Sequence, residues 1–110
     1  MPTYNLSQTG LPIAVLGDSV QTATTLHQGV ADGAAPTVGF WSISAFNTTG
    51  DHVRLTIQFG APHCAMTLVV PPSGAGATPV VAHVPLPRSA TLKAHASHSN
   101  AVFLYGYWES

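Results

Sequence analysis

The sequence predicts an all-β protein, an antiparallel β-sandwich or partly open barrel of about seven or eight short strands with an extended N-terminal arm. Short apolar or alternating segments recur along the 110 residues and are separated by turns rich in Gly, Pro, Asn and Asp. This spacing is typical of sandwiches and barrels. No segment has a helical period of useful length. We therefore expect an arm at residues 1–11 and a single β-sandwich domain at residues 12–110.

The first third of the chain gives the weakest strand signals. The arm contains Pro and Gly without periodicity, and we expect it to dangle or to lie on a neighbouring molecule. A short apolar run follows at residues 12–16 and ends in Gly17-Asp18, which is turn chemistry. Residues 20–28 are rich in threonine and indicate an exposed strand, and residues 29–36 indicate a loop.

The middle of the chain predicts two strands around a turn. Residues 37–46 are apolar on both sides, with Trp41 on one face and Phe40 on the other. Residues 52–59 alternate cleanly. Their inward positions are Val53, Leu55, Ile57 and Phe59, and their outward positions are His52, Arg54, Thr56 and Gln58. Because the turn at residues 47–51 is short and polar, we expect the two strands to be antiparallel neighbours.

The second half predicts a further strand, a loop, an edge strand and a hairpin. Residues 64–70 form the strand, and residues 71–76 have the composition of a surface loop. Residues 80–86 are expected at a sheet edge, because the nearby prolines cannot donate to a ladder. Residues 90–96 and 101–108 flank a polar four-residue turn and read as a hairpin.

The last strand is apolar on both sides. Val102, Leu104 and Trp108 lie on one face, and Phe103, Tyr105 and Tyr107 lie on the other. Strands of this kind are buried on both faces. A domain of this size covers one face with its own core, so we expect a partner to cover the second.

Charge is scarce. The chain has three Lys and Arg residues and four Asp and Glu residues, 6% of the total, where soluble domains average about 25%. We infer that much of the surface is held in an assembly; the alternative is an exterior that is polar but uncharged. With three cations we expect no nucleic-acid footprint, and no apolar stretch or signal peptide indicates a membrane. We expect synthesis in the cytoplasm.

The sequence predicts no enzyme, no cofactor and no metal site. Residues 17–20, Gly-Asp-Ser-Val, resemble the first block of a family of serine esterases, but the blocks that carry that family's base and oxyanion donor are missing. The four carboxylates fall in turns or near the terminus. Six histidines could bind a metal, yet no two share a strand face at i and i+2. The single Cys64 is expected to be a small buried hydrophobe.

From Ser42 onward the order of features resembles the small β-sandwich structural proteins of tailed-phage virions, in particular head decoration or cement proteins. The features are Ser-Ala-Phe-Asn-Thr-Thr-Gly, an alternating strand, Val-Pro-Leu-Pro-Arg-Ser-Ala-Thr-Leu, and Ala-Ser-His-Ser-Asn-Ala-Val-Phe-Leu-Tyr-Gly-Tyr. The resemblance implies a non-enzymatic protein of the capsid surface. It would bind and stabilise the capsid lattice as a homo-oligomer, with the major capsid protein or another virion protein as partner.

We expect the partner contacts to come from the aromatic residues of the two-sided strands and from the arm. They are Tyr4, Leu6, Leu11, Phe40, Trp41, Phe103, Tyr105 and Tyr107. Two other functions stay open. One is a carbohydrate-binding, lectin-like module, in which Trp41, Tyr105, Tyr107 and Trp108 would stack on sugars. The other is a head-tail or tail accessory protein of a phage.

Overall fold

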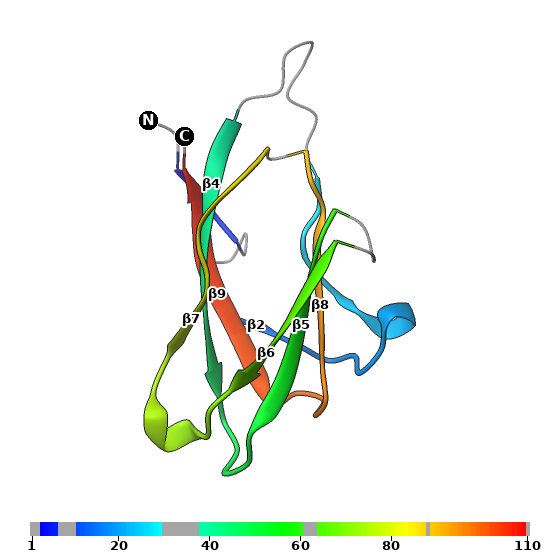
Figure 1. Cartoon of the computed structure of the whole chain (residues 1–110), viewed down its shortest axis with the longest axis vertical. Helices are drawn as coiled ribbons and strands as arrows, with labels where there is room; N and C mark the ends of the chain where they lie inside the picture. The colour runs from blue at the N-terminus through cyan, green and yellow to red at the C-terminus, as the bar shows by residue number, and fades with distance from the viewer. Residues whose placement is uncertain (1–2, 7–10, 30–37, 61–63, 88, 110) are drawn as a thin grey trace.

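The computed structural model describes residues 3–6, 11–29, 38–60, 64–87 and 89–109, and these form two antiparallel sheets packed face to face (Figure 1). The all-β sandwich expected from the sequence is confirmed. Two 3₁₀ turns, η1 (Val20–Thr22) and η2 (Ser73–Ala75), lie in the connections. The loop expected at residues 29–36 falls, from residue 30 onward, outside the described residues.

The first sheet, called sheet A, has five strands in the part of the chain that the structure describes. They are β1 (Thr3–Asn5), β2 (Ile13–Ala14), β4 (Val38–Asn47), β7 (Thr78–Pro87) and β9 (Val102–Glu109). The order is β1-β9-β4-β7, and β2 also pairs with β9. Strand β9 is therefore central, with β4 along one side and the two short strands along the other. As expected from its prolines, β7 lies at the edge.

The second sheet, sheet B, has four strands within the described ranges, in the order β3-β8-β5-β6. They are β3 (Thr24–His27), β5 (Val53–Phe59), β6 (Ala65–Val70) and β8 (Leu92–Ala96). Strands β5 and β6 form a hairpin. The predicted strand at residues 20–28 is shorter than expected, because its first residues form η1.

Part of the N-terminal arm belongs to the sandwich, which corrects the expectation that it dangles or lies on another molecule. Strand β1 pairs with the end of β9, with Tyr4 opposite Trp108. The Leu6 N–H donates to the carbonyl oxygen of Gly106 at 2.9 Å, and the Leu6 side chain is buried. Residues 1–2 and 7–10 of the arm lie outside the described residues. With β1 and β2, the described residues contain nine strands, above the expected seven or eight.

The two predicted hairpins around residues 47–51 and 97–100 are wrong. Strand β4 pairs with β7 and β9, whereas β5 pairs with β6 and β8. Strand β8 likewise belongs to sheet B and β9 to sheet A. Both turns are arches that carry the chain from one sheet to the other. The two strands that each turn joins therefore belong to different sheets, and their apolar sides face each other across the core.

Side chains in the turns explain the arches. Asn47 is buried, and its Nδ2 donates to the carbonyl oxygens of Asp51 at 2.6 Å and Val70 at 3.3 Å. Its Oδ1 accepts the Thr49 N–H at 2.9 Å. In the second arch Asn100 has a left-handed φ of 57°, and its N–H donates to Val15 O at 2.9 Å. Val70 and Val15 lie outside the strands that these turns join, so each turn is also bonded to another part of the sandwich.

The core lies between the sheets. Its largest fully buried side chains are Trp41, Trp108, Ile43, Leu55, Ile57, Leu92, Leu104, Val15, Val53, Val70, Val81 and Val102. The alternation of β5 is confirmed for its inward residues, but Gln58 on the outward side is only 4% exposed. Cys64 is exposed, which corrects the expectation of a buried thiol. It precedes edge strand β6 and so lacks the cover of a second sheet.

Trp108 connects three strands of sheet A. Its Nε1–H donates to the carbonyl oxygen of Leu86 on β7 at 2.9 Å, so the indole spans the intervening strand β4. It can do so because Gly39 on β4 has no side chain. A Cβ there would lie 2.1 Å from Cζ2 of Trp108. The glycine thus provides the space in which the indole packs.

We expect Gly39→Ala to lower the free energy of unfolding by about 1–3 kcal/mol, because the added methyl group overpacks the Trp108 ring. Gly74→Ala is the matched control: a Cβ at Gly74 would meet nothing within 4 Å, and its effect should stay within about 0.5 kcal/mol. Urea unfolding followed by tryptophan fluorescence measures both. Equal stability of the two variants would contradict the packing of Trp108 over Gly39.

Candidate functional site

The outer face of sheet A carries a set of aromatic side chains, here called the aromatic face. Its members are Phe40, Phe46, His83, Phe103, Tyr105 and Tyr107. Because side chains alternate along a strand, burying Leu104 and Trp108 in the core turns Tyr105 and Tyr107 outward. Each tyrosine is 41% exposed. The two-sided strand expected from the sequence therefore has one side in the core and one side open in the single chain.

Ring contacts order one end of the aromatic face. Phe46 and Phe103 are opposite each other on β4 and β9, and their rings are stacked with centroids 5.5 Å apart and planes at 10°. Tyr105 lies diagonally next to Phe46, with centroids 6.1 Å apart. Aromatic pairs of this kind add about 0.5–1.5 kcal/mol beyond area burial. The rings are thus held in place before any partner arrives.

A β-bulge in edge strand β7 builds the other end. Trp41 lies opposite Val84 and Ile43 opposite Val81, so the single residue between them on β4 faces two residues on β7. One of the two is His83, whose φ is 54°. Its imidazole stacks on Phe40 with centroids 4.0 Å apart and planes at 6°. The bulge therefore turns the histidine onto the aromatic face.

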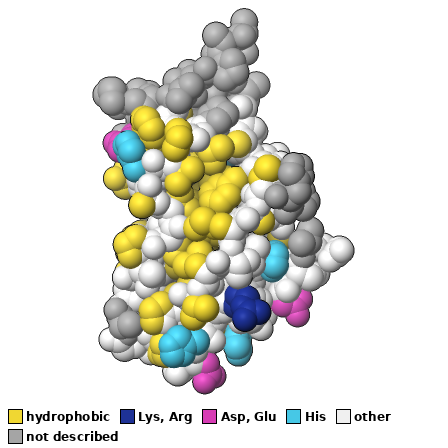
Figure 2. All heavy atoms as spheres, in the orientation of Figure 1, with side chains coloured by type: hydrophobic (Ala, Val, Ile, Leu, Met, Phe, Trp, Pro, Cys, Tyr) yellow, Lys and Arg dark blue, Asp and Glu magenta, His cyan; other side chains and the backbone are white. Residues whose placement is uncertain are grey.

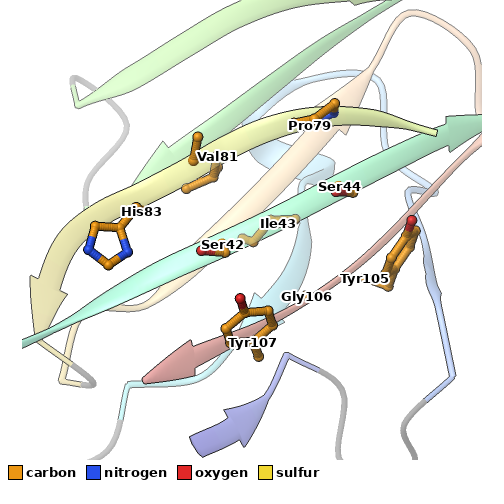
Figure 3. A pocket seen from close by; sticks show the side chains of 10 residues that line it. Ser42, Ile43, Ser44, Pro79, Val81, His83, Tyr105, Gly106 and Tyr107 are labelled. Atoms are coloured by element: carbon orange, nitrogen blue, oxygen red, sulfur yellow. The ribbon is translucent and has the colours of Figure 1, made fainter. Parts of the chain in front are cut away.

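A groove of about 370 Å³ runs across the middle of this face. Figure 3 shows Ser42 and Ser44 on β4 between Tyr105 and Tyr107 on β9 and His83 on β7. The lining offers hydroxyl groups, an imidazole and ring faces, and none of its described residues is Asp, Glu, Lys or Arg. Its chemistry suits hydrogen bonding and stacking with an uncharged partner.

The charged side chains among the described residues lie elsewhere or at the margin. Arg54 and Lys93 are exposed on the outer side of sheet B, and Asp18 and Asp51 are exposed in connections. Glu109 is half-buried opposite Phe40, at the end of β9. The two outer faces of the sandwich therefore differ: one is aromatic and nearly uncharged, and the other carries the described cations.

The structure brings together four of the eight predicted contact residues: Phe40, Phe103, Tyr105 and Tyr107. Trp41 and Leu6 lie in the core, so neither is available to a partner, and both are removed from the contact set. Tyr4 is partly exposed but packs against Trp108, with centroids 5.7 Å apart. Leu11 is exposed outside the strands.

Sequence reasoning did not select Phe46, Ser42, Ser44 or His83. The alternation of β4 places the first three on the same side as Phe40, and that signal was present. No such signal exists for His83, because a bulge changes which side of the strand a residue faces. The platform of four aromatic residues considered for sugars is also corrected, since Trp41 and Trp108 are buried.

The Gly-Asp-Ser segment begins a short turn. The Ser19 Oγ lies 3.0 Å from the Thr22 Oγ1, and the backbone N–H groups of Asp18 and Ser19 both donate to that Thr22 oxygen at 3.2 Å. The serine hydroxyl is therefore hydrogen-bonded to Thr22 of η1. Across the described ranges, no three His, Cys, Asp or Glu residues lie close enough to hold a metal ion together.

Comparison of the chain with models of protein families, with curated proteins and with solved structures finds no match. Among the residues that the structure describes, no helix has both the length and the apolar character needed to span a membrane.

The left-handed backbone conformation of His83 in the bulge affects the stability of the protein. At a φ of 54° a side chain with a Cβ is strained relative to glycine. His83→Ala and His83→Gly both remove the imidazole, so they differ mainly in this strain. We expect the Gly variant to be more stable than the Ala variant by about 1 kcal/mol. Thermal unfolding of the pair provides the measurement, and an Ala variant of equal or greater stability would refute the left-handed bulge.

Proposed function

We propose that the protein is a non-enzymatic structural protein that attaches through its aromatic face to a protein lattice, the surface of a tailed-phage capsid. The observation that carries the proposal is the contrast between the two outer faces. Interface centres are poor in charged residues and rich in aromatic ones, and the aromatic face has this composition. Tyr105 and Tyr107 combine large apolar area with a hydroxyl, which is typical of binding hot spots.

The sequence resemblance to head decoration proteins supplies the class of partner. A protein that binds only the assembled lattice shifts the equilibrium toward assembly. Many copies on one shell allow a modest contact to act through multivalency. Tyr105, Tyr107 and Phe103 would form the centre of this contact, and Phe40 with His83 would form its margin. The protein would reach the capsid from the cytoplasm of the host.

A second candidate function rests on the groove. Exposed tyrosines beside serine hydroxyls are groups that can stack on a sugar ring and bond its hydroxyls. The groove could therefore hold one or two units of a neutral oligosaccharide. We place this candidate second because the aromatic face extends well beyond the groove, to the Phe46 and Phe103 rings at one end and Phe40 at the other.

The test uses the Tyr105→Ser, Tyr107→Ser double variant and phage particles purified from cells that encode this chain. The wild-type protein should sediment with particles and raise their resistance to heat. The double variant should bind about tenfold to a hundredfold more weakly, because truncating an aromatic side chain at a binding hot spot lowers the affinity more than tenfold. Leu16→Ser is the control, since Leu16 is exposed away from the aromatic face.

Three results are decisive. Particles that lack the protein altogether, or a double variant that binds them as well as the wild type, would refute the capsid role. Retention on a column of neutral oligosaccharide that the double variant loses, without particle binding, would replace it by the carbohydrate function. Urea unfolding of the double variant should match that of the wild type, since both tyrosines are partly exposed.

A further inference from the structure

Strand β6 forms an edge of sheet B without the features that usually protect a sheet edge. Among the described strands it pairs with β5 alone. Its sequence is Ala-Met-Thr-Leu-Val-Val, which contains no proline and no charge. Exposed strands with this composition pair readily with another chain. Val69 is 53% exposed there, and Ala65 and Thr67 are exposed as well.

The other sheet edges are protected. Strand β7 contains Pro79, Pro85 and Pro87, and proline has no N–H to offer a new neighbour. Strand β3 has only four residues and a register shift between Thr25 and His27. Strands β1 and β2 have three and two residues. Short, bulged or proline-containing edges resist pairing, so β6 is the exception among the described edges.

The hydrogen-bond pattern identifies the free backbone groups. The Phe59 N–H donates to the carbonyl oxygen of Cys64 at 2.7 Å. In an antiparallel pair, bonded and non-bonded positions alternate. Since Ile57 lies opposite Met66 and Leu55 opposite Leu68, the backbones of Met66 and Leu68 bond to β5. Those of Ala65, Thr67 and Val69 therefore point to the open side.

The free N–H and C=O groups of Ala65, Thr67 and Val69 can pair with the same groups on a second β6 strand. We propose that β6 pairs with β6 of a second copy of this chain, antiparallel about a two-fold axis at Thr67, so that two sheets B become one continuous sheet. Thr67 then lies opposite Thr67 of the second copy, and Ala65 opposite Val69 of the second copy. All three are positions with free N–H and C=O groups, so each pair exchanges two hydrogen bonds.

The side chains agree with this register. A two-fold axis perpendicular to the sheet keeps inward residues on the inward side, so Met66 lies opposite Leu68 of the second copy. Both residues are only half-buried in the single chain, although they face the core. Figure 2 shows apolar side chains along the seam between the two sheets. The second copy would lengthen the apolar layer at this seam.

The pairing also avoids charge repulsion. Because β6 has no ionised side chain, a two-fold axis places no like charges opposite each other, whereas charged side chains on an edge strand prevent such contact. A second copy fits better than an extended segment of unrelated sequence, since the spacing of the free groups and the apolar pairs both match under the two-fold. The aromatic face is on the other sheet and stays accessible.

The first experiment compares Thr67→Glu with Thr25→Glu by sedimentation equilibrium of the purified chain. Both threonines are exposed, and they lie on opposite edges of sheet B. The wild type should be in a concentration-dependent monomer-dimer equilibrium. Thr67→Glu places two carboxylates opposite each other and should weaken dimerisation about tenfold or more. Thr25→Glu should dimerise like the wild type, and urea unfolding should show both variants folded.

The second experiment tests the register in a Cys64→Ser background, which removes the exposed native thiol. Thr67→Cys should form an intermolecular disulfide under mild oxidation, because the paired Cα atoms lie about 5.5 Å apart, within disulfide range. Val69→Cys should not, because its two copies are about 14 Å apart along the strands. Non-reducing electrophoresis distinguishes the two.

Several outcomes would overturn the proposal. A wild-type protein that stays monomeric at its highest attainable concentration excludes the dimer. A dimer that survives Thr67→Glu uses another surface. Equal cross-linking of Thr67→Cys and Val69→Cys indicates non-specific collision. These results are independent of particle binding, which the aromatic face mediates in the proposed function, so either proposal can fail alone.

Discussion

The position of one indole ring determines which side of sheet A faces outward. Trp108 lies in the core and bonds to Leu86 across strand β4, in the space that Gly39 leaves. A register slip of one residue would turn every side chain of β9 to the opposite face. Such a slip would break the Trp108 bond and place tyrosines in the core. The outward position of the aromatic face therefore depends on the packing of Trp108 in the core.

The alternation of side chains along the strands could be predicted from the sequence, but which strands would pair could not. The alternation of β9 separates Leu104 from Tyr105 as expected, and that of β5 is right except for the burial of Gln58. The predicted strand pairing is wrong at both turns, because a short polar turn can either close a hairpin within one sheet or connect two different sheets as an arch. The choice depends on distant partners, such as Val70 for Asn47, that local sequence does not reveal.

The candidate site was predicted in part for the same reason. Its tyrosines follow from alternation, which is a local property. Both Phe40 and Trp41 on β4 are apolar, so the sequence does not distinguish them, and Phe40 is the one that lies on the aromatic face because adjacent residues point to opposite sides. His83 depends on a bulge, and a bulge arises from the match between two strands. The exposed thiol of Cys64 likewise follows from the hairpin at the edge of sheet B.

The central place of β9 in sheet A has a consequence for synthesis on the ribosome. Strands β1, β2 and β4 are made before it, and all three bond to it. At about 5–20 residues per second, β4 waits several seconds for β9, and during that time the edge of β4 that pairs with β9 has no partner. Sheet A can form completely only late in translation. Until then, nascent chains expose an unpaired strand edge to one another. Chaperone capture, and slower elongation ahead of β9, would then affect the yield of folded protein.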